Sequence, residues 1–223
     1  MNDYPEFFVR GRAALLAGAT THERPLVEDA MRWGAAAVMR PGGPVLAELT
    51  DLAKSVGGTA GAGHWVHGPE SLHFTLRSLD RYRKVIPDDD PRRLAYAASL
   101  AEAVAGLPPV RIEVRGVSPH SGGVLAFGHP VDDTLTTLQR RFARSLRTRG
   151  AAEFESWVRD RWYVSLVHFG TPVTDPEPIV AWCDEHADVP IGLAEINTVE
   201  IVEAVPAGVG IRLNTLERSA LAG

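Results

Sequence analysis

A regular alternation of apolar and charged side chains is the feature that most restricts how this sequence can fold. Residues 110–117 alternate almost throughout, a polar turn follows at residues 118–123, and residues 124–127 are apolar again. Successive side chains of a strand point to opposite faces of its sheet, so this pattern predicts a hairpin with one buried face. Hairpins of this kind require an antiparallel sheet whose apolar face is covered by other elements.

Strands and helices follow one another along the rest of the chain. Apolar patterning predicts further strands at residues 33–41, 72–79, 162–169, 195–202 and 208–213, and helices at residues 45–56, 93–105, 132–146 and 176–186. Strands in antiparallel pairs with helices outside them predict an α+β protein rather than a doubly wound α/β one. The series of strand, helix and hairpin occurs twice, which predicts two similar lobes.

Composition excludes several classes of function. The chain has 223 residues with 23 basic and 28 acidic side chains, and a net charge of −5 argues against broad binding to long nucleic acid. A single cysteine, Cys183, excludes a disulfide framework and is expected to be a small buried side chain. No apolar run approaches the roughly 20 residues that span a bilayer, and the first residues lack the pattern of a signal peptide. We therefore expect a cytoplasmic protein that does not enter a membrane.

The residues most informative about chemistry lie in the predicted strand at residues 72–79. Residues two apart in a strand point to the same side, so His73 and Thr75 project together while the apolar residues around them face the core. An imidazole can move a proton, and a neighbouring hydroxyl can donate a hydrogen bond to a phosphoryl oxygen. A His-x-Thr triplet alone is most often accidental, so the surrounding sequence decides its meaning.

The segment around this triplet resembles the first signature of the 2H phosphoesterase superfamily, which includes bacterial RNA 2′,3′-cyclic phosphodiesterases, formerly called 2′-5′ RNA ligases. The family pattern is a strand ending near a proline, a helix, and a segment like Trp-Val-x-x-Glu-x-Leu-His-x-Thr-Leu. This chain supplies Val38 to Pro41, a helix from Val45, and then Trp65-Val66, Pro69-Glu70 and Leu72-His73-Phe74-Thr75-Leu76, with one extra residue before Glu70. The later elements also follow in the family's order.

The resemblance covers residues 33–223. It implies a bilobal fold in which two antiparallel sheets surround a central cleft, with helices outside. Residues 1–32 lie outside the resemblance and form an N-terminal extension of unknown role.

The family uses two such motifs, one from each lobe, facing each other across the cleft. The second is expected in residues 161–168, where alignment of the hydroxyl places Ser165 correctly but puts Tyr163 where the second histidine belongs. His168 lies three positions beyond Ser165 and so has the opposite strand parity, which predicts that it faces away from the cleft. Only a β-bulge between them would turn it inward.

The resemblance implies phosphodiester hydrolysis, in which one group activates water and another protonates the departing ribose oxygen. A tyrosine phenol ordinarily has a pKa of about 10, so we expect His73 to be the base and Tyr163 the proton donor, with Thr75 and Ser165 holding phosphate oxygens. This division predicts a pH profile governed by one ionisation near the usual range of histidine. A half-buried tyrosine is also common in strands for packing reasons alone, so its role stays a hypothesis.

Two further residues are candidates for ligand binding. Arg77 has the strand parity of His73 and Thr75 and could reach an anionic ligand, and Trp65 could stack on a base, although core packing is the commoner role of tryptophan. The remaining histidines lack the spacing of a metal site and are expected to be ordinary polar side chains: His22, His64, His67, His120, His129 and His186. We expect no metal and no cofactor.

From the sequence we thus expect a phosphodiesterase-like enzyme. Its substrate would be a small phosphorylated molecule, a 2′,3′-cyclic or 2′-5′-linked nucleotide, or a short RNA end. Two alternatives stay open because one motif histidine is replaced. The same cleft could serve an enzyme acting on a small metabolite without phosphate, or the protein could be a non-catalytic nucleotide-binding module.

Overall fold

The structure is a computed structural model, and it describes residues 5–23, 26–152, 154–155 and 157–222. In this part of the chain, nine strands form one sheet in the order β7-β4-β5-β6-β3-β1-β8-β9, with β2 also paired to β6. The strands are β1 (Ala36–Met39), β2 (Trp65–Val66), β3 (Phe74–Ser78), β4 (Val110–His120), β5 (Gly123–Pro130), β6 (Trp162–His168), β7 (Pro190–Ile196), β8 (Thr198–Ala207) and β9 (Gly210–Ala220).

The pairings between these strands are antiparallel, which confirms the predicted α+β class. The two sheets that the resemblance predicts are joined into one continuous sheet. β3, from the half that contains β1, β8 and β9, is hydrogen-bonded to β6, from the half that contains β4, β5 and β7. The two halves are therefore continuous, and the contact between β3 and β6 is where the two predicted motifs meet.

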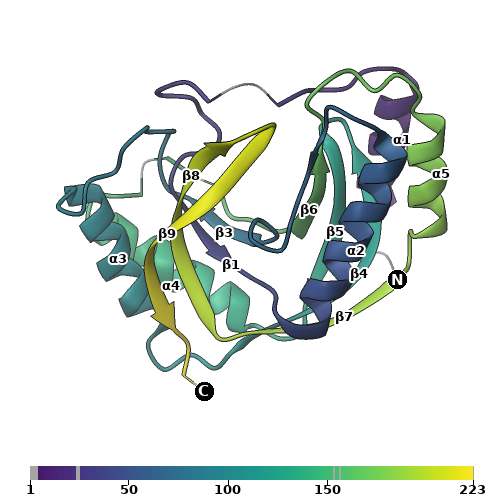
Figure 1. Ribbon diagram of the computed structural model, residues 1–223. Helices are drawn as coiled ribbons and strands as arrows, with labels where there is room; N and C mark the ends of the chain where they lie inside the picture. The colour runs from purple at the N-terminus through teal and green to yellow at the C-terminus, as the bar shows by residue number, and fades with distance from the viewer. Residues whose placement is uncertain (1–4, 24–25, 153, 156, 223) are drawn as a thin grey trace.

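Helices cover the outside of the sheet. They are α1 (Pro5–Leu16), α2 (Gly43–Ala60), α3 (Pro91–Val104), α4 (Thr134–Thr148) and α5 (Glu177–Glu185). Figure 1 shows α3 and α4 beside one half of the sheet and α1, α2 and α5 beside the other. Their apolar stripes are buried against the strands, as Leu49 of α2 and Phe142 of α4 illustrate, each with no exposed surface. No helix in the described ranges is long and apolar enough to cross a membrane.

Helix α2 is longer than its sequence predicts. The glycine pair Gly57 and Gly58 favours an end at that point, but the helix continues to Ala60 and is capped by Gly61. A Cβ on Gly57 would lie 2.4 Å from Cγ2 of Val66. The glycine therefore serves close packing of α2 against β2 instead of ending the helix.

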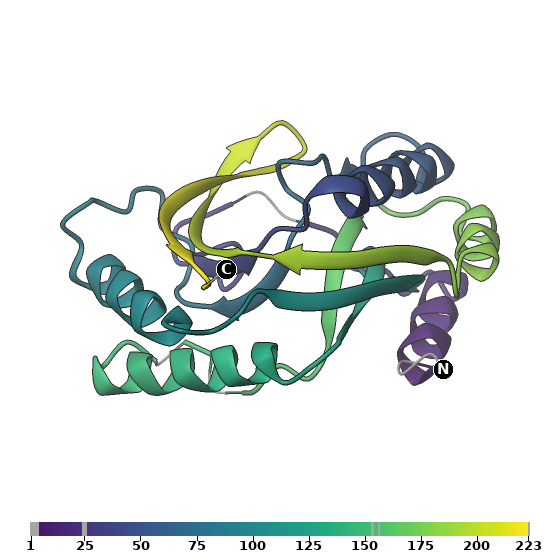
Figure 2. The same ribbon diagram turned by 90° about the horizontal axis from the view of Figure 1, so that it is seen from below.

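The predicted strand at residues 195–202 is two strands. β7 pairs with β4 and β8 pairs with β1, so the chain changes partner at Asn197 and crosses from one half of the sheet to the other (Figure 2). The apolar alternation continues across this point, so the pattern does not reveal the change.

The N-terminal extension packs on the rest of the chain; of it, the structure describes residues 5–23 and 26–32. Helix α1 lies against β4 and α5, Leu15 is buried, and Arg12 forms an ion pair of 3.1 Å with Asp184 of α5. Sequence patterning did not predict this helix.

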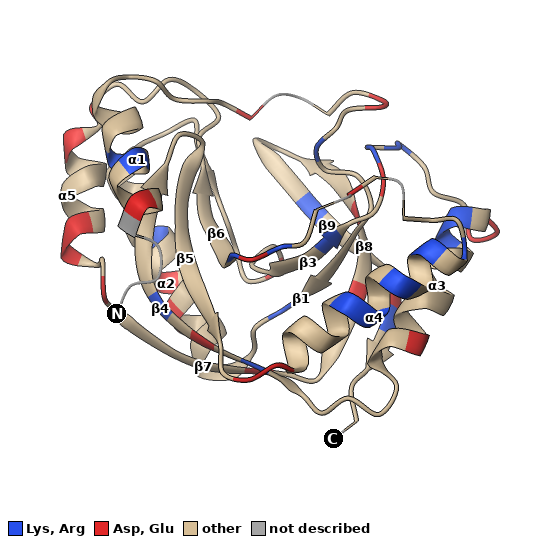
Figure 3. Ribbon diagram, turned by 180° about the vertical axis from the view of Figure 1, so that it is seen from behind, with Lys and Arg blue, Asp and Glu red and all other residues tan. Residues whose placement is uncertain are grey.

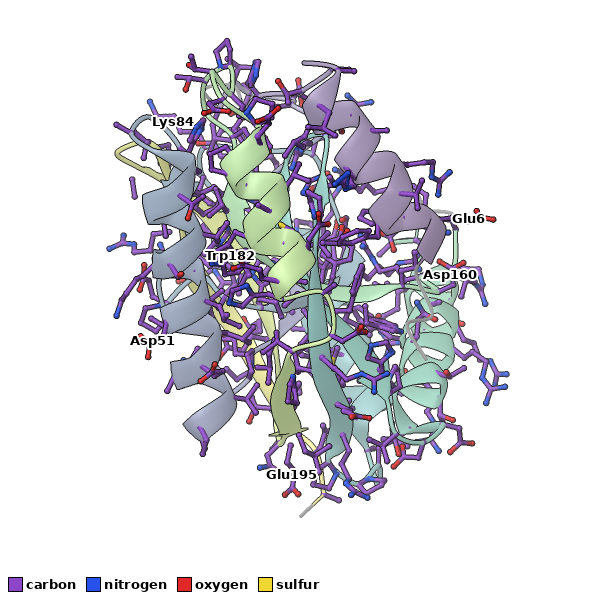
Figure 4. All side chains as sticks on the ribbon, turned by 90° about the vertical axis from the view of Figure 1, so that its right-hand side faces the viewer. Glu6, Asp51, Lys84, Asp160, Trp182 and Glu195 are labelled. Atoms are coloured by element: carbon purple, nitrogen blue, oxygen red, sulfur yellow. The ribbon has the colours of Figure 1, made fainter. Side chains whose placement is uncertain are left out.

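Helix α5 is linked to α2 through the side chain of Trp182. Trp182 lies between the two helices (Figure 4) and donates a hydrogen bond of 3.0 Å to the hydroxyl of Ser55. Its neighbour Cys183 is fully buried, and burial raises the pKa of its thiol far above the usual value. The predicted role of Cys183 as an inert core residue agrees with this position.

Candidate active site between β3 and β6

The site is built around one pair of apolar residues. Phe74 of β3 and Val164 of β6 are Cα partners, and both side chains are fully buried. Since neighbouring residues of a strand point to opposite faces, the residues on either side of this pair point away from the core. These four polar residues line one cavity of about 180 Å³: His73, Thr75, Tyr163 and Ser165.

Antiparallel register decides how the four residues are arranged. With Phe74 opposite Val164, His73 lies beside Ser165, and Thr75 lies beside Tyr163. His73 and Tyr163 are therefore diagonal neighbours, and the Cα atoms of such pairs are about 7–8 Å apart in antiparallel sheets. Both side chains project into the same cavity.

His73 is held in one tautomer by the backbone. Its Nδ1 lies 2.7 Å from the carbonyl oxygen of Ser71, to which it donates a hydrogen bond, so Nε2 carries the lone pair. Burial, together with the positive charges of Arg40 and Arg159, lowers the pKa of His73 to about 4 against the opposing effect of the Ser71 carbonyl. The ring is therefore neutral at pH 7 and can accept a proton.

The three hydroxyls of the site are available to a ligand. Thr75 and Ser165 are half-buried, and 38% of Tyr163 is exposed. Within the described part of the chain, none of the three hydroxyls has a hydrogen-bond partner. Polar groups that line a cavity without a protein partner are groups that a polar ligand can satisfy.

Two arginines bring guanidinium groups to the cavity. Arg159 lines it and is held by Glu155, at 2.7 Å, and by the hydroxyl of Ser78, at 3.2 Å. Arg32 also lines it and forms an ion pair of 2.7 Å with Glu23. Lys and Arg are also frequent on α3 and α4, whereas α5 carries acidic residues (Figure 3). Each arginine is paired with a glutamate and Asp80 also lines the cavity, so the two guanidinium groups offer an anion local hydrogen-bond donors and not a net positive charge.

Arg77 does not line the cavity, contrary to the parity argument. Ala37 pairs with Arg77 and Val38 pairs with Thr75, so one step along β1 spans two residues of β3. This β-bulge at Leu76 reverses the parity of the residues beyond it. Arg77 is buried and donates a hydrogen bond to the backbone carbonyl of Glu155, whereas Ser78 lines the cavity in the position that was expected for Arg77.

Trp65 does not line the cavity that contains His73. It lines a different cavity of about 490 Å³ and has only 7% of its surface exposed. The ring of His67 stacks on it at 3.9 Å, and a Cβ on Gly210 would lie 2.5 Å from three atoms of its five-membered ring. Neighbouring residues therefore cover the indole, and Trp65 is a packing residue.

A second bulge brings His168 into the cavity, although strand parity predicted the opposite. Val124 pairs with Val167 and Leu125 pairs with Ser165, so β6 contains one extra residue at this point. His168 thereby lines the same cavity as Ser165. The bulge lies where β5 and β6 approach closely, since a Cβ on Gly123 would lie 1.9 Å from the carbonyl oxygen of Val167.

Three cavity residues come from the region around the end of the predicted extension. Met31, Arg32 and Trp33 line the cavity, and the indole nitrogen of Trp33 donates a hydrogen bond of 2.8 Å to Glu23. Neither these residues nor Arg159 carries a sequence signal for such a role, because they precede strands and lie in irregular segments. Among the described residues, no group of three or more His, Cys, Asp or Glu side chains is placed to hold a metal ion.

Several solved structures share this arrangement of elements. The chain is similar to TT0787 of Thermus thermophilus, with 17% identity, coverage of 85% of this chain and 98% of that chain, and a TM-score of 0.60. It is also similar to a crystal structure of a phosphoesterase, with 14% identity, coverage of 86% and 99%, and a TM-score of 0.61. Escherichia coli LigT complexed with NADP+ matches with 13% identity, coverage of 88% and 100%, and a TM-score of 0.57.

No protein-family model matches the sequence, and no curated protein matches it either. At such low identities, the similarity to solved structures concerns the fold. That fold is the one that the motif around His73 predicted. The chain has the fold of the 2H phosphoesterases.

Proposed function

We propose that the protein is a phosphodiesterase that hydrolyses a small 2′,3′-cyclic or 2′-5′-linked nucleotide, a class that includes short RNA ends. The observation that carries this proposal is the pairing of Phe74 with Val164, which brings two polar motifs from distant parts of the chain into one cavity. Structures of E. coli LigT with phosphate, 3′-AMP and ATP support a small phosphorylated ligand for this fold.

Each of the four motif residues has a role in the proposed reaction. Nε2 of His73 takes a proton from water as the water oxygen bonds to phosphorus. The bond between phosphorus and the ribose oxygen breaks, and the hydroxyl of Tyr163 protonates that oxygen. The proton on His73 then returns to the tyrosine oxygen, which leaves a phosphomonoester and the enzyme in its starting state. Thr75 and Ser165 hold the non-bridging oxygens.

Two features of the cavity fit this reaction. A neutral His73 is in the protonation state that a base requires at pH 7, because burial and nearby arginines keep its pKa near 4. Arg159 is held in place by Glu155 and Ser78, so its charge is positioned before the ligand binds.

The direct test is turnover of nucleoside 2′,3′-cyclic phosphates, followed by the phosphorus resonance of the monoester product. We expect the full-length chain to release a monoester, and His73→Gln to lower kcat/KM by about two to four orders of magnitude. His186→Gln is the matched control, because His186 lies at the end of α5 and stacks on Trp182 away from the cavity. Equal turnover by both variants would contradict the proposal.

Calorimetry with the same compounds separates the alternatives. Binding together with turnover supports the phosphodiesterase. Binding without turnover indicates a nucleotide-binding module, which the replacement of the second motif histidine by Tyr163 would then explain. If the protein neither binds nor hydrolyses these compounds, the result indicates an enzyme that uses this fold for a different chemistry.

A further inference from the structure

Two buried histidines outside the predicted motifs are hydrogen-bonded to each other at the cavity wall. Nδ1 of His168 lies 2.8 Å from Nε2 of His67. His168 is 5% exposed and His67 is 2% exposed, and only His168 lines the cavity. Because the partner ring occupies Nδ1 of His168, Nε2 is the nitrogen that remains for a ligand.

The second nitrogen of His67 decides where the protons lie. Nδ1 of His67 is buried and makes no hydrogen bond of good geometry with the described residues, since the Ser71 carbonyl next to this ring accepts its hydrogen bond from Nδ1 of His73. If His168 donated its Nδ1 proton to His67, the proton of His67 would sit on this orphaned nitrogen. A buried N–H without an acceptor is rare and costly. The favourable arrangement is therefore the opposite one, in which His67 donates from Nε2 to Nδ1 of His168 and His168 keeps its own proton on Nε2.

Packing holds both rings in this geometry. Trp65 stacks on His67 at 3.9 Å and on His168 at 5.1 Å, and Trp33 meets His168 edge to face at 5.3 Å. Burial and the neighbouring His73 lower the pKa of His67 to about 3, and burial and the neighbouring His67 lower the pKa of His168 well below its usual value. Both imidazoles are therefore neutral at pH 7.

We propose that His168 is an anion-binding residue whose neutral Nε2–H donates a hydrogen bond to a phosphate oxygen in the cavity, and that His67 is a positioning residue that keeps the proton on this nitrogen. The inference rests on the proposed phosphate-type ligand. A neutral imidazole serves as a hydrogen-bond donor to substrate oxygen in other enzymes. The bulge in β6 thus gives the site a second histidine five positions after Tyr163.

Two substitutions at His168 separate the role of Nε2 from that of the ring as a whole. His168→Gln places an amide nitrogen near the position of Nε2, whereas His168→Asn places one near Nδ1, facing His67. With inorganic phosphate as the probe in calorimetry at pH 7.5, we expect Asn to weaken binding about tenfold or more. We expect the dissociation constant of His168→Gln for phosphate to stay within about threefold of the wild-type value, because glutamine keeps a donor at the cavity wall.

A measurement on the unmodified protein guards against variants that fail to fold. The ring nitrogens of a histidine labelled with ¹⁵N report which nitrogen is protonated. We expect His168 to show a protonated Nε2, and His67→Phe to reduce the population of that tautomer. A proton on Nδ1 of His168, or equal phosphate affinities for the folded Asn and Gln variants, would overturn the inference.

Phosphate binding by the wild-type protein and by the Asn variant distinguishes a wrong role for His168 from a wrong function for the protein. If the wild-type protein binds phosphate and the Asn variant binds it equally well, His168 has no role in anion binding while the phosphodiesterase proposal stands. If the wild-type protein binds neither phosphate nor a nucleoside 2′,3′-cyclic phosphate, both proposals are wrong.

Discussion

Phe74 and Val164 lie opposite each other in an antiparallel pair that joins the two halves of the sheet. Their side chains fill the core, so the residues that flank them face the cavity in two diagonal couples. The catalytic proposal depends on this register. A shift of either strand by one residue would bury the polar motif residues of that strand and bring its apolar side chain into the cavity.

Tyr163→Phe tests the proton donor. We expect kcat to fall by about ten to a hundredfold with little change in KM, because the phenol acts on the leaving oxygen in the transition state and not on the bound substrate. Steady-state kinetics with a nucleoside 2′,3′-cyclic phosphate measures this effect. Unchanged turnover would remove Tyr163 from the mechanism.

The pH profile tests the state of His73. The sequence predicted an ionisation near the usual range of histidine, but burial lowers the pKa of His73 to about 4. Since kcat/KM reports ionisations of the free enzyme, we expect it to stay level from neutral pH down to about pH 5 and to fall at lower pH. An acid limb centred near pH 6.5 would show that His73 is not the base or that it is not desolvated.

Stability should also depend on pH. The folded-state pKa of His67, about 3, lies below the unfolded value of 6.5. Between these values the unfolded chain binds a proton that the folded chain does not, so the free energy of unfolding falls as pH drops from about 6.5 toward 4. His67→Phe should make this dependence shallower by about one proton, or about 1.4 kcal/mol per pH unit. Urea titrations at several pH values measure the slope, and an unchanged slope would contradict the assignment.

Arg159→Met should affect both binding and stability. Its side chain lines the cavity, and it is the ion-pair partner of Glu155, whose side chain is 1% exposed. Removal of one member of a buried pair leaves an uncompensated charge, which costs about 3 kcal/mol of unfolding free energy. We also expect a KM increase of about tenfold. Arg159→Lys keeps the charge and should recover part of both effects, whereas equal losses in the two variants would argue against a role for the charge.

Gly123→Ala tests the bulge that turns His168 inward. A Cβ at this position would lie 1.9 Å from the carbonyl oxygen of Val167, so β5 and β6 would have to separate next to His168. We expect a lower Tm and weaker phosphate binding. Gly42→Ala is the control, since a Cβ there meets nothing within 4 Å. A Tm for Gly123→Ala that matches the control would contradict the close approach.

The sequence alone determined most of the strands, most of the helices and the two polar couples that flank Phe74 and Val164, but it did not reveal the change of strand partner at Asn197. These features are local, because the two-residue period of a strand assigns each side chain to a face without reference to any partner. Family resemblance added which strands should meet, and the structure places them next to each other.

Tertiary structure decided the positions of Arg77, His168 and Trp65. A bulge is a property of two paired strands, so the parity of Arg77 and His168 changes at points where a single strand pattern gives no signal. The rings of Trp33 and His168 around Trp65, and the cavity residue Arg32, come from segments that are distant from Trp65 in the sequence, and only packing brings them together. Local periodicity therefore set the faces of the strands, and pairing between distant strands set which side chains reach the cavity.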